Sequence, residues 1–183
     1  ALRKDVARQV LAPPPRSTGK SAAEAPNVRF QADLIDFAKN TRTASGAKMA
    51  LLITDVFTRE ARALPLKNKK PQEINEALKK TLQELKGDKQ DIVLTTDAGG
   101  EFARIEEALP ENAIARQKKP QDVNALAVVD RTMQSIKRSL AGVSAKKGGD
   151  WDQNLKQVVS AYNETPHSAV FGAPGDVSQN STQ

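Results

Sequence analysis

Three strand-like segments joined by short connections constrain the fold of this chain more than any other feature of the sequence. They cover residues 28–37, 47–57 and 59–66, and the first connection, "AKNTRTASG", is rich in turn-forming residues. Short connections favour antiparallel pairing, because a parallel pair of strands needs a crossover of a dozen or more residues. The three segments therefore predict an antiparallel meander. Pro65 cannot donate a backbone hydrogen bond, which predicts that it lies at a sheet edge or a strand end.

Segments with helical and strand character alternate after this meander. Residues 71–87 begin at Pro71, carry apolar residues at helical spacing and end at Gly87, which predicts a helix. Residues 91–97, "DIVLTTD", form a continuous apolar run typical of a buried parallel strand. We expect four further elements: a short helix over 101–109, a strand within 112–117, a long helix over 123–142 and a final helix over 151–166. The order of elements predicts an α/β fold, in which a mixed sheet is flanked by helices.

The length of the chain, 183 residues, suits one domain with extensions. We expect residues 1–26 to form a basic helix and a linker rich in Pro, Ser and Ala, residues 27–177 to form the folded domain, and residues 178–183 to form a tail. The chain begins with alanine, which predicts a fragment or a processed product. No apolar run reaches the roughly 20 residues of a membrane-spanning helix, so we expect no such segment.

Charge and composition narrow the possible chemistry. The chain has 28 Lys and Arg against 22 Asp and Glu, a net charge of +6, which is typical of proteins that bind nucleic acid or an acidic partner, although an ordinary basic surface is the alternative. It contains no cysteine and a single histidine, His167. This excludes thiolate zinc sites and sites with several histidines, and it disfavours catalysis by histidine.

Three aspartates lie in or beside apolar segments, where a carboxylate is unexpected. Asp33 sits in the middle of a mostly apolar strand, where aspartate is disfavoured unless it is paired or binds a ligand. Asp97 ends the apolar strand, at the end where ligands collect in open α/β sheets, although it could simply cap the following helix. Asp130 lies beside the apolar stripe of the long helix, with Lys137 two turns further along the same side. Each aspartate alone is more often structural.

Taken together, the three aspartates predict a metal site. Mg²⁺ and Mn²⁺ prefer oxygen ligands, and two such ions about 4 Å apart can hold the attacking and leaving oxygens of a phosphodiester. Such a site requires several carboxylates on rigid elements and needs neither histidine nor cysteine. The sequence can supply it, with lysines near enough to bind phosphates.

Five motifs, taken in order, resemble the catalytic core of a retroviral-type integrase. They are "FQADLIDF", "LLITDVFTREARALPLKNK", "TTDAGGEF", "VVDRTMQSIKRSL" and "YNETPHSAVFGAPGDV", and they span residues 28–177. The chain looks most similar to integrases of LTR retrotransposons and of Maverick/Polinton elements. The resemblance implies a ribonuclease H-like fold with a mixed sheet of five strands, and it makes residues 27–177 an integrase-like catalytic core.

The resemblance also implies an activity and a set of site residues. The catalytic and metal-binding acids of the family map onto Asp33, Asp97 and Asp130, which would hold two Mg²⁺ or Mn²⁺ ions for DNA end processing and strand transfer. His167 is interpreted as a structural turn residue. DNA is the expected partner, a homodimer is possible, and the nucleus is the expected compartment of an active integrase. The expected nucleic-acid-binding residues are Lys118, Lys119, Arg131 and Lys137.

Departures from the family pattern leave a second hypothesis open. Asp130 stands where the family has glutamate, and Ala98 and Leu126 stand where polar residues are common. We recognise neither the zinc-binding domain that usually precedes such a core nor the DNA-binding domain that follows it. These differences favour a domesticated, inactive relative that acts as a binding or scaffold subunit with protein partners, for which an organelle is a possible compartment. A ribonuclease H-like nuclease is a third hypothesis.

Overall fold

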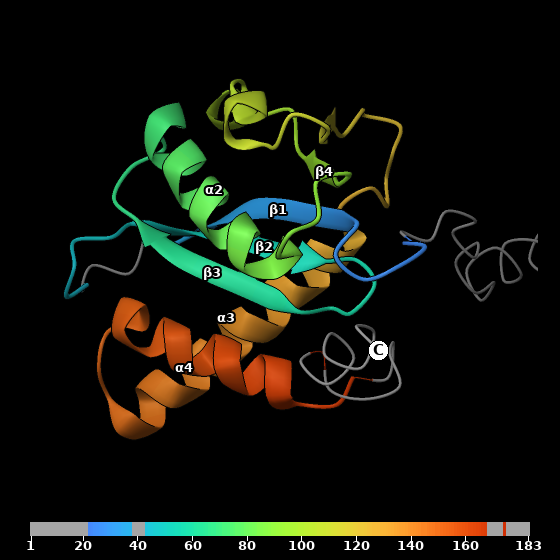
Figure 1. Ribbon diagram of the computed structural model, residues 1–183. Helices are drawn as coiled ribbons and strands as arrows, with labels where there is room; N and C mark the ends of the chain where they lie inside the picture. The colour runs from blue at the N-terminus through green and yellow to red at the C-terminus, as the bar shows by residue number, and fades with distance from the viewer. Residues whose placement is uncertain (1–21, 38–42, 168–173, 175–183) are drawn as a thin grey trace, which may run out of the picture.

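The computed structural model describes residues 22–37, 43–167 and 174, and in this part of the chain five strands form one sheet (Figure 1). The order of the strands across the sheet is β3-β2-β1-β4-β5. The bounds of the strands are β1 (Arg29–Asp36), β2 (Met49–Asp55), β3 (Ala61–Leu66), β4 (Val93–Thr96) and β5 (Ile114–Gln117).

The pairing of the strands is mixed, as the sequence predicts. β1 pairs antiparallel with β2, and β2 pairs antiparallel with β3, which confirms the meander. β4 lies parallel to β1 on its other side, and β5 continues parallel to β4. β3 is an edge strand, so Pro65 lies where its missing N–H group leaves the sheet intact. β1 therefore joins the antiparallel half of the sheet to the parallel half.

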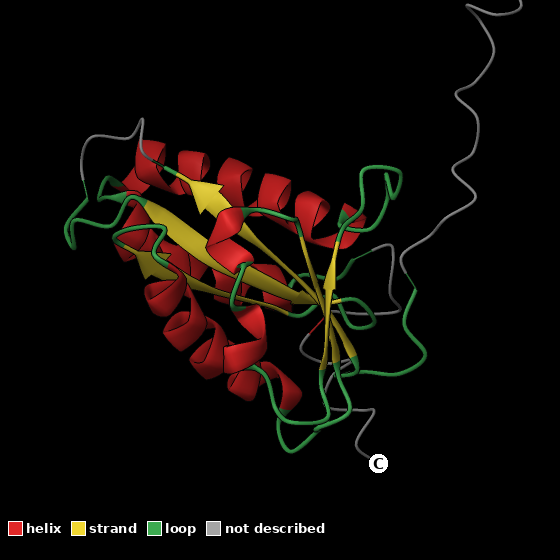
Figure 2. Ribbon diagram, turned by 90° about the horizontal axis from the view of Figure 1, so that it is seen from above, coloured by secondary structure: helices red, strands yellow, loops and turns green. Residues whose placement is uncertain are grey.

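In the described part of the chain, three helices cover the two faces of the sheet. Helix α2 (Pro71–Lys86) lies on one face, and helices α3 (Ala127–Lys147) and α4 (Trp151–Glu164) lie on the other (Figures 1 and 2). Each face buries its own hydrophobic core, and the β1 side chains divide between the two as their alternation predicts. Phe30 and Ala32 pack in the core of α2, whereas Ile35 packs in the core of α3 and α4. Gln31 and Asp33 belong by the same alternation to the face covered by α3.

The ends of two elements differ from the prediction. In place of a helix over 101–109, the chain forms two 3₁₀ turns, Gly100–Phe102 and Ile105–Ala108, each of the short length typical of 3₁₀ structure. The long helix starts at Ala127 instead of 123, since residues 123–126 form a turn. It continues to Lys147 instead of 142, and it ends at Gly148, whose φ of 71° suits glycine.

Two other expectations concern the ends of the chain and the membrane. The basic helix over 2–10, most of the linker and the tail over 178–183 lie outside the described residues. Among the described helices, none combines the length and the apolar character that crossing a membrane requires.

Asp55 holds the turn between β2 and β3. Its carboxylate is fully buried and accepts hydrogen bonds from the backbone N–H groups of Asn27, Phe57 and Thr58 and from the Thr58 hydroxyl, the last at 2.8 Å. Burial raises the pKa of Asp55, and these four donors oppose the rise. The carboxylate therefore accepts hydrogen bonds from backbone N–H groups that have no strand partner where β2 turns into β3.

We predict that Asp55→Ala lowers the free energy of unfolding by about 2 kcal/mol, because buried donors lose their acceptor. Urea unfolding of the two proteins at neutral pH measures the difference. Asp88→Ala is the matched control, since Asp88 is an exposed aspartate outside this turn. A loss no larger than that of the control would show that Asp55 does not hold the turn.

Candidate active site

Asp33 and Asp97 lie side by side at the junction of β1 and β4. The register of these parallel strands pairs Gln31 with Thr95, and each aspartate lies two residues beyond this pair. Both side chains are partly buried. The Asp97 carboxylate accepts a hydrogen bond from the backbone N–H of Gly99 at 3.1 Å, so it closes a local turn after β4 and does not cap a helix.

Asp130 joins them from the other layer. It lies in the first turn of α3 and is exposed to solvent. The start of this helix is fixed to β1, because the side-chain oxygen of Gln31 accepts hydrogen bonds from the N–H groups of Val128 and Val129, both at 3.0 Å. The helix stripe beneath Asp130 is buried as expected at Leu126, whose place in the core accounts for an apolar residue at this position.

The ionisation of Asp33 responds to three other acids. Burial raises its pKa most, a hydrogen bond of 2.7 Å from the backbone N–H of Leu34 opposes this, and the negative charges of Asp97, Asp130 and Glu101 raise it further. Like charges act in this way only when they lie close together. Asp97, Asp130 and Glu101 therefore lie near enough to Asp33 for their charges to act on it.

Glu101 is a fourth acid that the sequence reasoning missed. It follows Asp97 by four residues in "DAGGE", and its carboxylate reaches back across Gly99. A Cβ atom on Gly99 would lie 2.5 Å from a carboxylate oxygen of Glu101 and 3.1 Å from one of Asp97. The glycine therefore leaves the space that both carboxylates occupy. The spacing of the two acids around a Gly-Gly pair was the available signal.

The donor chemistry of the cluster fits a hard divalent cation, since every side chain offers anionic oxygen and the acids repel one another. The geometry is looser than a finished site. Among residues 22–37, 43–167 and 174, no group of three or more His, Cys, Asp or Glu side chains is close enough to hold a metal ion. Binding would require the carboxylates to come closer together, and the exposed Asp130 side chain is free to move.

The four residues expected to bind nucleic acid lie on two elements. Lys118 follows β5, and its N–H donates to the backbone oxygen of Thr96, which places it beside the strand that ends at Asp97. Lys119 is the next residue and is exposed. Arg131 and Lys137 are exposed on α3, one residue and seven residues after Asp130. All four remain predictions.

The segment that closes the domain is structural. The amide of Asn163 makes two hydrogen bonds of 2.9 Å with the backbone of Ala61, so the end of α4 is tied to the start of β3. Tyr162 bonds the hydroxyl of Thr132 on α3, and the His167 ring packs on it with ring centroids 4.4 Å apart. These contacts agree with the interpretation of His167 as a turn residue.

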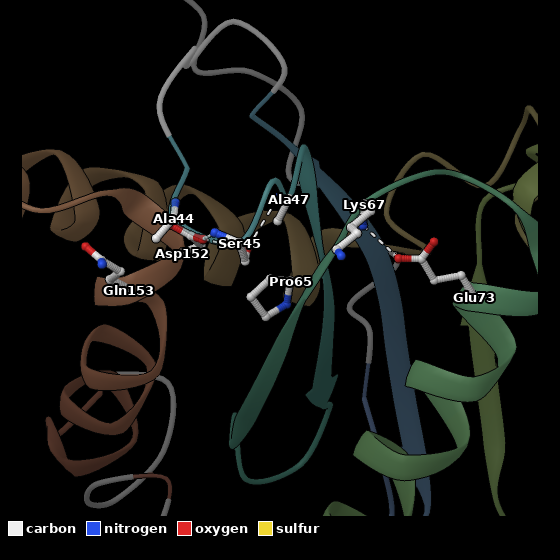
Figure 3. A pocket seen from close by; sticks show the side chains of 8 residues that line it. All are labelled: Ala44, Ser45, Ala47, Pro65, Lys67, Glu73, Asp152 and Gln153. Atoms are coloured by element: carbon white, nitrogen blue, oxygen red, sulfur yellow. Dashed lines mark hydrogen bonds between the residues drawn. The ribbon is translucent and has the colours of Figure 1, made fainter.

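A separate cavity of about 570 Å³ lies away from the acids, near the start of α4 and the end of β3 (Figure 3). Asp152 uses its carboxylate there to accept bonds from the N–H groups of Ala44 and Ser45, and Glu73 accepts one from Lys67. None of the predicted site residues lines this cavity. Its polar groups serve mainly to hold loops to helices.

No protein-family model matches the chain. An uncharacterized transposon-derived protein of Caenorhabditis elegans is 27% identical over 135 residues, which cover 72% of this chain and 46% of that protein. The chain thus spans about half the length of the curated relative that it matches.

Solved structures establish the fold. The chain is similar to a chain of the simian T-cell lymphotropic virus intasome in complex with PP2A regulatory subunit B56 gamma, with a TM-score of 0.71, 16% identity and coverage of 87% of this chain and 57% of that one. It is also similar to the HTLV-2 integrase catalytic core domain in complex with magnesium, with a TM-score of 0.65, 14% identity and coverage of 85% of this chain and 99% of that one. The catalytic core domain of BIV integrase gives a TM-score of 0.67, 14% identity and coverage of 85% of this chain and 96% of that one. The predicted ribonuclease H-like fold and the resemblance to integrase cores are confirmed.

We predict that Asp33→Asn raises the melting temperature at neutral pH, by roughly 2 °C, because it removes a partly buried charge from among like charges. The folded pKa of Asp33 is raised, so wild-type stability from this group is fully present below the unfolded pKa, about 4, and is lost as pH rises through the folded pKa. The gain from Asp33→Asn should therefore be largest at pH 7 to 8 and vanish near pH 4. Calorimetry across this range measures it, and a gain that is independent of pH would contradict the assignment.

Proposed function

We propose that this chain is the core of a metal-dependent DNA recombinase, which processes DNA ends and joins them to a target by phosphodiester transesterification. The observation that carries the proposal is that the β1–β4 register, the turn around Gly99 and the start of α3 bring Asp97, Glu101 and Asp130 near Asp33. A cluster of repelling carboxylates costs stability, and groups with perturbed pKa values are concentrated at functional sites. The integrase-core fold and the magnesium named in the HTLV-2 structure support the same reading.

The three aspartates would hold the metal, and each has a distinct support. Asp33 is fixed in the central strand, and the Leu34 N–H orients one of its oxygens. Asp97 is oriented by the Gly99 N–H, and Asp130 has the freedom of an exposed first-turn side chain. When bound, divalent ions supply activation of the attacking oxygen and stabilisation of the leaving oxygen. Glu101 lies beside Asp97 and would add negative charge that favours cation binding.

The basic residues would bind the phosphate backbone of DNA. Lys118 lies beside the end of β4, and Arg131 and Lys137 lie on the helix that carries Asp130. Phosphate contacts position a duplex without reading its sequence, so these residues would set the register of the DNA over the acids. The net charge of +6 agrees with such a partner.

A second candidate function is a binding or scaffold role without chemistry. One observation favours it: the acids of the described residues do not form a compact ligand group. Asp130 is also one methylene shorter than the glutamate of the resembled family, and a shift of about 1 Å in a catalytic group can cost on the order of 100-fold in rate. In that case a protein partner would take the place of the DNA.

We predict that the protein nicks DNA and transfers strands in Mg²⁺ or Mn²⁺, and that Asp97→Asn lowers the rate by on the order of 100-fold or more, because a charged ligand is lost. A gel assay with labelled DNA ends measures both reactions. Asp91→Asn is the matched control, since Asp91 is an exposed aspartate just before β4. Equal activity in wild type and Asp97→Asn would remove the enzymatic proposal and leave the scaffold role.

A second prediction uses binding alone. At a metal concentration 100-fold above the dissociation constant, Mn²⁺ should add about 2.7 kcal/mol of stability, and the melting temperature should rise by roughly 5–10 °C. The rise should disappear in Asp33→Asn and in Asp97→Asn but persist in Asp91→Asn. Thermal unfolding with and without MnCl₂ decides the matter, and the proposed metal site fails if wild type and the two site variants respond alike.

A further inference from the structure

The three acid-bearing segments meet at one point, two residues before each acid. Gln31 precedes Asp33 by two residues, and the strand register pairs it with Thr95, which precedes Asp97 by two. The Gln31 side chain bonds the N–H of Val128, which in turn precedes Asp130 by two. One residue therefore contacts both other segments at equivalent positions.

Gln31 supplies what helix α3 lacks. The first N–H groups of a helix have no partner within it and need acceptors from elsewhere. No side chain of α3's own N-cap, Leu126, provides one, whereas α4 begins with a capping box between Asp150 and Gln153. The oxygen of Gln31 accepts from both Val128 and Val129 at 3.0 Å. The helix is thus capped by a residue of the sheet.

The residue type fits this task. Gln31 is only 3% exposed, so its bonds form where water cannot replace them and an unbonded N–H would be costly. A glutamate could accept the same two bonds, but it would add a negative charge to the face that already holds Asp33. A neutral amide of this length accepts the bonds without adding that repulsion.

We propose that Gln31 is a positioning residue, which sets the separation of Asp33, Asp97 and Asp130 by fixing the start of α3 on the junction of β1 and β4. The inference rests on the proposed function for its metal readout, although not for its structural one. Loss of the side-chain oxygen frees the first turn of α3, which carries Asp130, while Asp33 and Asp97 stay joined through the sheet.

The test compares Gln31→Met with Leu140→Ala. Gln31→Met keeps length and apolar volume but removes the acceptor. Leu140 is 3% exposed in the same helix, ten residues after Asp130 and about 15 Å along the axis, so its truncation destabilises α3 without touching its start. Should Gln31→Met fail to fold, Gln31→Asn takes its place, since one methylene fewer prevents the oxygen from reaching both N–H groups.

The first readout is hydrogen exchange at the Val128 and Val129 amides, without metal or DNA. We expect protection to fall at least about tenfold further in Gln31→Met than in Leu140→Ala, because only the former loses the acceptor. Protection equal to that of wild type would overturn the proposal.

The second readout is Mn²⁺ affinity from water proton relaxation, at a temperature where all variants are folded. We expect affinity about tenfold or more weaker in Gln31→Met and near wild type in Leu140→Ala. Equal affinities in the two variants would overturn the positioning role. If wild type binds no Mn²⁺, the proposed function fails, and a crystal structure of Gln31→Met decides the inference: displacement of Asp130 from Asp33 supports it, and an unmoved Asp130 overturns it.

Discussion

Strand β1 is the element on which the rest of the molecule depends, because it takes an antiparallel partner on one side and a parallel partner on the other. The pairing with β4 places Asp33 beside Asp97, and the alternation of β1 assigns Asp33 and Gln31 to the face covered by α3. Without the parallel half of the sheet, Asp33 would be an isolated polar residue in an apolar strand. With it, the residue becomes the centre of a cluster of charges.

The cluster of acids lowers the stability of the fold, and other contacts must offset this loss. Burial and three neighbouring carboxylates raise the pKa of Asp33, so the ionised site destabilises the fold at neutral pH. The apolar cores on both faces of the sheet supply the opposing stability, and the Phe37 and Trp151 rings, stacked with centroids 4.0 Å apart, join β1 to α4 on the side of the acids. An unfavourable group of charges persists only where the surrounding structure holds it in place.

The repeat of apolar residues, every two positions in strands and every 3.6 in helices, accounts for what the sequence could predict. Alternation assigned the β1 side chains to their faces, and the apolar run of 91–97 indicated a parallel strand that ends at Asp97. Local pattern failed where tertiary contacts decide the outcome. The start of α3 is set by Gln31, which lies far away in sequence, and the position of Glu101 follows from a turn around Gly99. No periodicity in the sequence reports either contact.

The contact between Gln31 and α3 bears on whether the short side chain of Asp130 can reach the other acids. The distance that an acid on a helix must bridge depends on how close the helix lies to the sheet. A glutamine of β1 that bonds the backbone of α3 directly, at 3.0 Å to two successive N–H groups, holds the first turn against the sheet. An aspartate can then span what a glutamate would span from a helix held further away, so the identity of the acid alone does not decide whether the site works. The position of the helix matters as well.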